Sequence, residues 1–173
     1  MEADSIQLET APVRPSPRRR ALAPATRRAV LTAHIVASVG LLGEVSGFLV
    51  VAIQASAAGD PSFAAAAYDL LATFTVVFGI PLSLTALATG IVLGLGTKWG
   101  ILRHPWVMIK LGLLASVIVI GALILGPSVE QMRTGGGGRE TLIVLGAAWD
   151  VLALGLATGL SVYKPGRARR RAA

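Results

Sequence analysis

Four ionisable side chains stand inside long apolar stretches of this 173-residue sequence, and any chemistry is to be sought there first. Two of them are acids, Glu44 and Asp150, and two are bases, His34 and Lys110. A charged group deep in a membrane costs at least a few kcal/mol unless it is paired, neutralised or hydrated. Each of the four is therefore a candidate functional residue.

The two acids are expected at similar depths. Glu44 lies 9 residues before the end of one apolar stretch, and Asp150 lies 8 residues after the start of another. At about 1.5 Å per residue, both are roughly 12–14 Å below the same face of a membrane. Two neighbouring carboxylates would share a proton or hold a cation, which predicts an ion or proton site. The alternative is two separate acids, each protonated and hydrogen-bonded, because the sequence does not show whether their helices are neighbours.

The two bases are expected near the opposite face. His34 and Lys110 each lie 5 residues inside an apolar stretch, roughly 7–8 Å deep. Lys110 can extend its ammonium group to the boundary, and a neutral His34 can hydrogen-bond to a neighbouring helix. Histidine is also a common metal ligand, so His34, Lys110 and His104 are candidates for a haem or copper site. His104 lies at a helix boundary, where a capping role is expected. We expect no cofactor by default, with haem b or copper as the alternative, and leave any metal unassigned.

Other chemistry is not indicated. The chain has no cysteine, which excludes disulfides and thiolate metal sites. Gly135–Gly138 is not followed by the Lys-Ser/Thr of a phosphate-binding loop, and no nucleophile is paired with a base. The net charge of +7 is concentrated at the flanks of apolar stretches, so no nucleic-acid partner is expected. An enzymatic activity is not predicted.

Composition places these residues in a membrane. Hydrophobic residues make up 54% of the chain and charged residues only 14%, against about 25% charged residues in a typical soluble domain. Lipid must therefore be the solvent for much of the chain. We predict an all-α membrane four-helix bundle over residues 29–163, with spans at about 29–53, 64–96, 105–125 and 142–163.

Prolines interrupt two of these spans. Pro81 predicts a kink in the second span, with Ser83 or Thr85 satisfying the carbonyl that the missing N–H leaves free. Gly126 and Pro127 are expected to end the third span, and residues 128–141 to form a flexible loop.

Basic residues indicate the orientation. Fourteen of the 16 Lys and Arg residues lie in the two tails or at a short hinge, residues 97–110, and only Arg133 and Arg139 lie in the other loops. The positive-inside rule therefore places both termini and the hinge in the cytoplasm, in a multi-pass protein of the cytoplasmic (inner) membrane. Trp99 and Trp106 flank the boundary, as aromatic anchors do.

Both ends of the chain are predicted to be disordered basic tails. Residues 1–28 and 164–173 contain too few apolar side chains to offset the entropy of ordering. A secretory signal cleaved near Ala55, Ser56 and Ala57 is the alternative for the first apolar stretch. That stretch has 25 residues, whereas a signal core has about 7–15, so we expect it to be retained as a span.

Glycines suggest where helices could approach one another. Gly43 and Gly47, and likewise Gly155 and Gly159, have the GxxxG spacing that lets another backbone come close. Besides the lipid bilayer, a membrane-protein partner or a homo-oligomer could use these glycine faces. A structural subunit of a membrane complex is therefore one interpretation.

Three segments resemble a known family. They are Thr32–Ile35 with Ser38–Gly40 and Gly43, then Gly96–Gly100 with Arg103, His104, Trp106, Val107, Lys110 and Leu111, and finally Leu160–Pro165. In this order, over about residues 26–166, they resemble an uncharacterised actinobacterial family of small four-helix integral membrane proteins. The resemblance implies the same fold and brings no established activity.

A more distant resemblance is to the copper-resistance D-type and four-helix protoporphyrinogen oxidase proteins. These share a histidine near the start of the first helix and a lysine early in a later one, which correspond to His34 and Lys110. The resemblance implies a haem- or copper-linked redox protein. Uncharacterised relatives often carry further histidines around the third and fourth helices, where this chain has apolar residues and Asp150. The first functional hypothesis remains a small transport or ion- and proton-handling component using Glu44 and Asp150.

Overall fold

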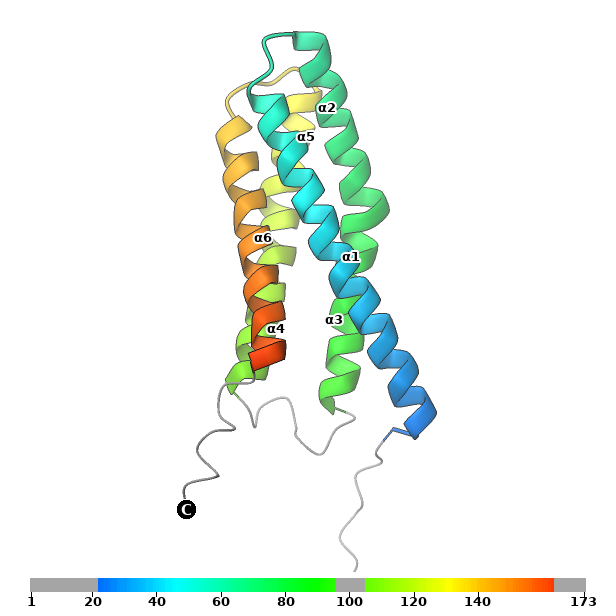
Figure 1. The fold of residues 1–173 in the computed structure, drawn as a ribbon. Helices are drawn as coiled ribbons and strands as arrows, with labels where there is room; N and C mark the ends of the chain where they lie inside the picture. The colour runs from blue at the N-terminus through cyan, green and yellow to red at the C-terminus, as the bar shows by residue number, and fades with distance from the viewer. Residues whose placement is uncertain (1–21, 96–104, 164–173) are drawn as a thin grey trace, which may run out of the picture.

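The computed structural model describes residues 22–95 and 105–163, and within these ranges every regular element is helical. Figure 1 shows one elongated bundle in which the chain runs back and forth along a common axis. The first helix is α1 (Pro24–Ser56). The second span is a series of three consecutive helical elements: α2 (Pro61–Phe74), the π-helical turn η1 (Thr75–Gly79) and α3 (Ile80–Leu95). The third is a series of the same kind: α4 (Pro105–Ile120), the π-helical turn η3 (Gly121–Leu125) and α5 (Gly126–Arg133). The last helix is α6 (Glu140–Tyr163).

The predicted fold class is confirmed. Four helical stretches in the described part of the chain are long and apolar enough to cross a membrane: Pro24–Ser56, Pro61–Leu95, Trp106–Arg133 and Glu140–Tyr163. The first helix begins at Pro24, inside the predicted tail of residues 1–28, because proline is well suited to the first turn of a helix. Residues 1–21 and 164–173 of the predicted tails, and residues 97–104 of the basic hinge with His104, lie outside the described residues.

The second helix begins at Pro61, three residues before the predicted start at residue 64, because Asp60 caps it. The Oδ1 atom of Asp60 accepts hydrogen bonds from the backbone N–H and the hydroxyl of Ser62, both at 2.9 Å. The hydrogen bond from the backbone N–H of Ser62 is the largest cause of the lowered pKa of the Asp60 carboxyl. Pro61 has no N–H that would need an acceptor in this first turn.

Both prolines inside the helical series stand six residues after the start of a π-helical turn. In each turn the N–H of the residue before the proline donates to the carbonyl five residues earlier, Ile80 to Thr75 and Gly126 to Gly121. This wider turn gives room to the proline ring, which would clash with the carbonyl four residues earlier in a regular α-helix. The helix therefore continues beyond each proline.

Two expectations about these prolines were wrong. Residues 126–127 do not end the third helix, which continues through α5 to Arg133, so the loop is limited to residues 134–139. There Gly135 and Gly138 have φ values of 83° and 84°, a conformation that suits glycine. In the second series, the hydroxyls of Ser83 and Thr85 donate to the carbonyls of Ile80 and Pro81 rather than to the freed carbonyl four residues before Pro81.

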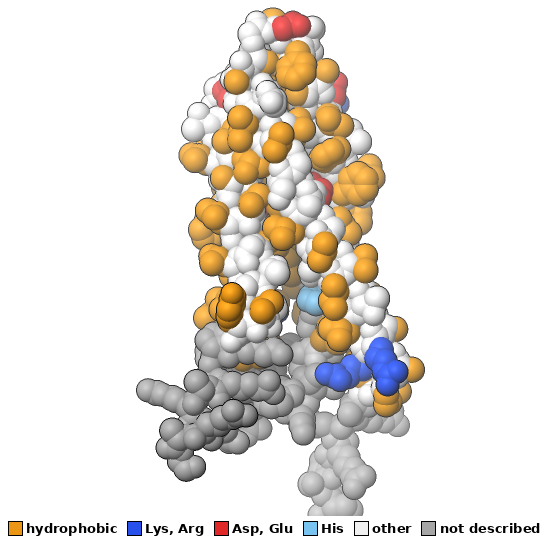
Figure 2. All heavy atoms as spheres, in the orientation of Figure 1, with side chains coloured by type: hydrophobic (Ala, Val, Ile, Leu, Met, Phe, Trp, Pro, Cys, Tyr) orange, Lys and Arg blue, Asp and Glu red, His pale blue; other side chains and the backbone are white. Residues whose placement is uncertain are grey.

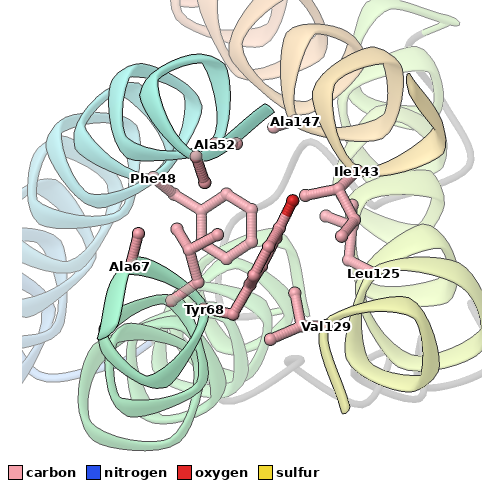
Figure 3. Packing of buried hydrophobic residues seen from close by; sticks show 10 residues of the cluster. Phe48, Ala52, Ala67, Tyr68, Leu125, Val129, Ile143 and Ala147 are labelled. Atoms are coloured by element: carbon pink, nitrogen blue, oxygen red, sulfur yellow. The ribbon is translucent and has the colours of Figure 1, made fainter. Parts of the chain in front are cut away.

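The interior of the bundle holds two clusters of buried apolar side chains. We call the first the end cluster, because it lies toward the end where α1 finishes; Figure 3 shows several of its side chains converging from four helices. Its members are Phe48, Ala52, Ala55, Ala67, Tyr68, Leu71, Leu125, Val129, Ile143 and Ala147. The middle cluster joins the centres of α1, α4 and α6 and consists of Leu41, Val45, Val117, Ala153 and Leu154.

The sides of the bundle are apolar. Large hydrophobic side chains such as Val39, Leu84 and Leu152 are 53–66% exposed. Figure 2 shows hydrophobic side chains along the length of the molecule, with basic groups near one end and acidic groups mostly toward the other. This distribution is what lipid on the sides and water at the ends require.

Candidate functional site

The two acids of the predicted site come from helices that pack against each other. Helices α1 and α6 are among the most closely packed pairs in the described structure, which answers the question of whether they are neighbours that the sequence left open. Glu44 and Asp150 are close enough to interact electrostatically. Both lie well inside the membrane-spanning segments, about 12 and 10 residues from the nearer helix ends, or roughly 15–18 Å at 1.5 Å per residue.

Asp150 is the more enclosed of the two acids. Its side chain belongs to a residue only 3% exposed, beside Ala153 and Leu154 of the middle cluster. Its Oδ1 atom has no hydrogen-bond partner among the described residues. A buried polar atom without a partner is costly, so the surroundings of Asp150 leave one acceptor available to a proton or ligand.

Glu44 is half-buried and its carboxylate faces a glycine. A Cβ atom placed on Gly79 would lie 3.4 Å from Oε1 of Glu44, so the absence of a side chain at residue 79 makes room for the carboxylate. Gly79 is the last residue of η1, two residues before Pro81. π-Helical turns occur frequently at functional sites. Sequence reasoning missed Gly79, and the only signal for it was a glycine shortly before an intramembrane proline.

His34 lies in a second glycine notch on the same helix pair. A Cβ on Gly90 would be 3.2 Å from Cε1 of the imidazole. The Nδ1 atom lies 3.1 Å from the carbonyl oxygen of Ala86 and 3.0 Å from Oγ1 of Thr89. Thr89 donates its own hydroxyl proton to the carbonyl of Thr85 at 2.6 Å. Both Nδ1 partners are therefore acceptors, which assigns the proton to Nδ1 and the lone pair of a neutral ring to Nε2.

Lys110 completes the group of intramembrane bases. Its ammonium group interacts electrostatically with His34 and lies 5.9 Å from the centre of the Trp106 ring. The two bases are thus near each other in space, although they come from α1 and α4. The acids and the bases occupy different levels of the bundle, as their positions along α1 show, because His34 precedes Glu44 by ten residues.

The fit of these side chains to a metal or haem is limited to His34. Metal-ligating histidines usually donate their other ring N–H to a carbonyl or carboxylate. In His34 the Nδ1–H is bonded in this way to Ala86 and Thr89, so Nε2 is the nitrogen that could bind a metal. Among residues 22–95 and 105–163, no three His, Cys, Asp or Glu side chains lie together as a metal-binding group. The described part of the chain therefore contains one histidine with a free ring lone pair on Nε2 and no group of three or more metal-ligating side chains.

The GxxxG glycines differ in their surroundings. Within the described structure, nothing lies within 4 Å of a Cβ placed on Gly43, Gly155 or Gly159, whereas one on Gly47 would meet Phe74 at 3.6 Å. Three of the four glycines therefore do not serve close packing between the described helices. Their use by a partner or a second copy stays a prediction.

The chain matches one protein family over most of its first three spans. A family model described as a predicted integral membrane protein (DUF2269) matches residues 28–137, more than half of the chain. The matched region includes His34, Glu44 and Lys110 and ends before α6, which carries Asp150. No curated protein and no solved structure shows a significant match. The predicted resemblance to an uncharacterised membrane-protein family is confirmed at this level, and the more distant copper- and haem-related resemblance stays a prediction.

Proposed function

The chain belongs to DUF2269, a family of predicted integral membrane proteins of unknown function, and from that premise we propose that it is a proton-handling membrane component that works through Glu44 and Asp150. The observation that carries the proposal is the packing of α1 against α6, which brings these two acids within electrostatic range of each other inside the bundle, with Asp150 almost fully buried. Two carboxyl groups within such range in a poorly hydrated interior cannot both ionise at low cost. They form a site that gains or loses one proton easily.

A proton suits the site better than a metal cation. A bare cation takes several oxygen ligands, about six to eight for Ca²⁺. The described residues provide two carboxylates here and no third acid or histidine beside them. A proton needs only the two carboxylates, and Oδ1 of Asp150 still has room for a hydrogen bond. A shared proton therefore needs no ligand beyond the carboxyl groups of Glu44 and Asp150.

The proposal includes an orientation. The described residues Arg27 and Arg28 stand at the end where α1 begins, and the same end carries the start of α4 with Lys110 and the end of α6. The positive-inside rule makes this the cytoplasmic end of a protein in the cytoplasmic membrane, with both termini inside. The acid pair then lies in the outer half of the membrane and the bases in the inner half.

Proton flux into liposomes tests this function. Purified protein is reconstituted with a trapped pH-sensitive dye, and a potassium diffusion potential drives protons inward. We expect faster acidification than in protein-free liposomes, and loss of the difference in Glu44→Gln and in Asp150→Asn. Glu140→Gln, which changes an acid at the start of α6 away from the pair, is the matched control. A flux equal to that of protein-free liposomes, or one unchanged in a variant that combines Glu44→Gln with Asp150→Asn, would overturn the proposal.

A second function is favoured by the hydrogen bonds of His34. A haem- or copper-linked redox role would use Nε2 of His34 to hold the group, with Nδ1 bonded to Ala86 and Thr89 and Lys110 within electrostatic range. The bound group would supply electron transfer. The test is the visible absorption spectrum and metal content of protein purified from haem-supplied cells. A stoichiometric Soret band that is lost in His34→Ala supports this role, and a colourless, metal-free protein contradicts it.

A further inference from the structure

We infer that Gly79, which the π-helical turn η1 holds against α1, is a positioning residue of the proton site and determines how readily Glu44 gains and loses its proton. This inference rests on the proposed function, because it concerns one of the two acids of the same site. The contacts that the second span makes with α1 on both sides of Glu44 support it.

Side chains and glycines interlock where α1 meets the second span. Gly40, Glu44 and Gly47 lie on one face of α1, because they are four and three residues apart. A Cβ on Gly40 would lie 3.4 Å from Cδ1 of Leu82, and one on Gly47 would lie 3.6 Å from Cε2 of Phe74. At these two levels the second span provides the side chain and α1 provides the glycine. At the level of Glu44 the roles are reversed, so that α1 provides the side chain and the second span provides the glycine.

The carboxyl group of Glu44 lies across the backbone of Gly79. A Cβ placed on this glycine would be 3.4 Å from Oε1 and 3.7 Å from both Cδ and Oε2, so all three atoms of the carboxyl group are next to the same residue. Phe74 packs against the end cluster and Leu82 against the middle cluster. Apolar side chains therefore flank the carboxyl group along the helix axis, and a side chain at residue 79 would change the surroundings of the whole group.

The geometry of η1 explains why Gly79 is on the face that meets α1. Phe74 and Leu82 are eight residues apart, which in a regular α-helix would separate them by about 80° around the axis. The additional residue of a π-helical turn offsets about 100° of rotation, which leaves the two side chains within about 20° of each other. By the same geometry, Gly79 would be about 140° from Phe74 without η1 and is about 40° from it with η1. The π-helical turn therefore brings Gly79 to Glu44.

The other π-helical turn provides a comparison. Gly79 is the last residue of η1 and Leu125 is the last residue of η3, and each precedes a proline by two residues. Leu125 is 6% exposed, and its Cδ2 atom would lie 2.7 Å from a Cβ on Gly146 of α6. In η3 this position thus packs a large apolar side chain against a neighbouring helix, whereas in η1 it has no side chain and faces a carboxyl group. Glu44 accounts for the glycine in η1 better than helix packing does.

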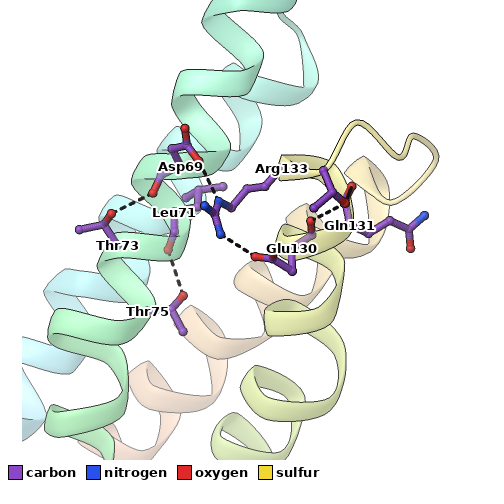
Figure 4. A network of polar contacts seen from close by, with 8 residues as sticks. Asp69, Leu71, Thr73, Thr75, Glu130, Gln131 and Arg133 are labelled. Atoms are coloured by element: carbon purple, nitrogen blue, oxygen red, sulfur yellow. Dashed lines mark hydrogen bonds and ion pairs between the residues drawn. The ribbon is translucent and has the colours of Figure 1, made fainter.

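Contacts on both sides of η1 hold it in place. The hydroxyl of Thr75, the first residue of η1, donates to the carbonyl of Leu71 at 3.0 Å (Figure 4). Before η1, α2 is well packed against α5, and Nε of Arg133 donates to Oδ1 of Asp69 at 2.7 Å. After η1, α3 packs closely on α1 and only sparsely on α4, and Figure 1 shows α1 and α3 separating from α4 and α6 toward the end where α1 begins. The packing of α3 on α1 therefore determines where Gly79 lies.

The acid that Gly79 faces has few other charged neighbours. Residues 70–95 of the second span contain no ionisable side chain. Asp150 of α6 is within electrostatic range of Glu44, and the bases His34 and Lys110 are at the other level of the bundle. A change at residue 79 therefore acts on Glu44 without altering another charge beside it.

An infrared titration of the Glu44 carboxyl group tests the positioning role. Asp150→Asn serves as the background, because the C=O band that remains there and is lost on Glu44→Gln belongs to Glu44. Gly79→Ala and Gly79→Ser are compared in this background. Both side chains begin with the same Cβ, which makes ordinary van der Waals contact with the carboxyl group, but only the serine adds a hydroxyl. Gly121→Ala in η3, whose Cβ would meet nothing within 4 Å, is the matched control.

We expect the titration of the Glu44 band to move to higher pH in Gly79→Ala, because the methyl group covers the carboxyl group and disfavours its charged form. In Gly79→Ser the titration should lie at lower pH than in Gly79→Ala, because a hydrogen bond to the charged form favours it. Gly121→Ala should leave the titration unchanged. Alanine and serine variants that titrate at the same pH, or a shift of the same size in Gly121→Ala, would overturn the inference.

The proposed function can fail separately from this inference. If the expected titrations are found and the native protein gives no proton flux in liposomes, Gly79 positions Glu44 and the acid pair does not carry protons. If the native protein carries protons and the alanine and serine variants titrate alike, the function stands and the role of Gly79 is wrong.

Discussion

At the scale of single residues, the side chains inside the bundle are positioned by packing more than by hydrogen bonds. Glu44 faces Gly79 of η1 and His34 faces Gly90 of α3, and Asp150 keeps one oxygen without a hydrogen bond among the described residues. Such an atom lowers stability, and proteins retain that cost most often at functional positions. The acid pair is therefore a feature that packing alone does not explain.

Ser128 provides a residue-scale test of this cost. Its buried Oγ also has no hydrogen-bond partner in the described structure, so Ser128→Ala should stabilise the fold by roughly 1–3 kcal/mol. Ser46→Ala is the matched control, because that hydroxyl donates to the carbonyl of Leu42 at 2.7 Å and its removal should bring no gain. Thermal unfolding in detergent measures both. Equal effects of the two changes would contradict the assignment of Ser128 as unsatisfied.

Two glycines on one helix give a second residue-scale test. A Cβ on Gly146 would lie 2.7 Å from Cδ2 of the buried Leu125, while one on Gly155 would meet nothing within 4 Å. Gly146→Ala should therefore destabilise the packing of α6 on η3 by about 1–3 kcal/mol. Gly155→Ala should stabilise α6 by about 0.5–1 kcal/mol, since alanine is the better helix former. Thermal unfolding measures both, and a stabilising Gly146→Ala would show that the helices do not approach as described.

At the scale of elements, local signals predicted the helices well and their interruptions poorly. Long apolar stretches indicated the spans, because any such stretch must form a helix in lipid. The continuation past Pro127 was missed, because a glycine–proline pair usually ends a helix and the residues of the compensating π-helical turn at 121–125 are apolar like the rest of the span. The same holds for η1, which positions Gly79 against Glu44.

The cap of α2 gives an element-scale prediction with a pH dependence. The folded state lowers the pKa of Asp60, so the carboxylate stabilises the helix start at pH values above the ordinary pKa of an aspartate. This stabilisation is lost as the pH falls through the lowered pKa. Asp60→Ala should therefore reduce stability slightly at neutral pH and have no effect in strong acid. Thermal unfolding of the native protein and Asp60→Ala, measured from strong acid to neutral pH, checks this prediction. Ser62→Ala, which keeps the backbone N–H donor, should have the smaller effect, and a pH-independent Asp60→Ala would contradict the cap.

At the scale of the whole molecule, the bundle is closed at one end and loosely packed at the other. The sequence indicated two levels of ionisable groups, but not that α1 and α6 are neighbours or that α3 and α4 diverge. Helix neighbours depend on contacts between residues far apart in the chain, such as those of His34 with Ala86 and Thr89. The glycine notches for Glu44 and His34 also arise from contacts between residues far apart in the chain. Neither notch could therefore be recognised from local spacing.

The ion pair that ties α5 to α2 gives a prediction at this scale. The side chains of Arg133 and Asp69 are 38% and 65% exposed, so a double-mutant cycle of Arg133→Gln and Asp69→Asn should give a coupling of only about 0.2–1 kcal/mol. The coupling should shrink as salt is added, because exposed charges are screened. A large coupling that does not depend on salt would mean that this end is held by the ion pair rather than by the apolar end cluster.

The measurement that tests the central claim most directly is an infrared titration of the protonated carboxyl C=O band in the native protein, Glu44→Gln and Asp150→Asn, with Glu140→Gln as control. If the two acids share a proton, the band left in each single variant titrates at a different pH from its counterpart in the native protein, and the two variant spectra do not add up to the native one. If the native titration equals the sum of the two variants, Glu44 and Asp150 are independent acids and the account of a shared proton site is wrong.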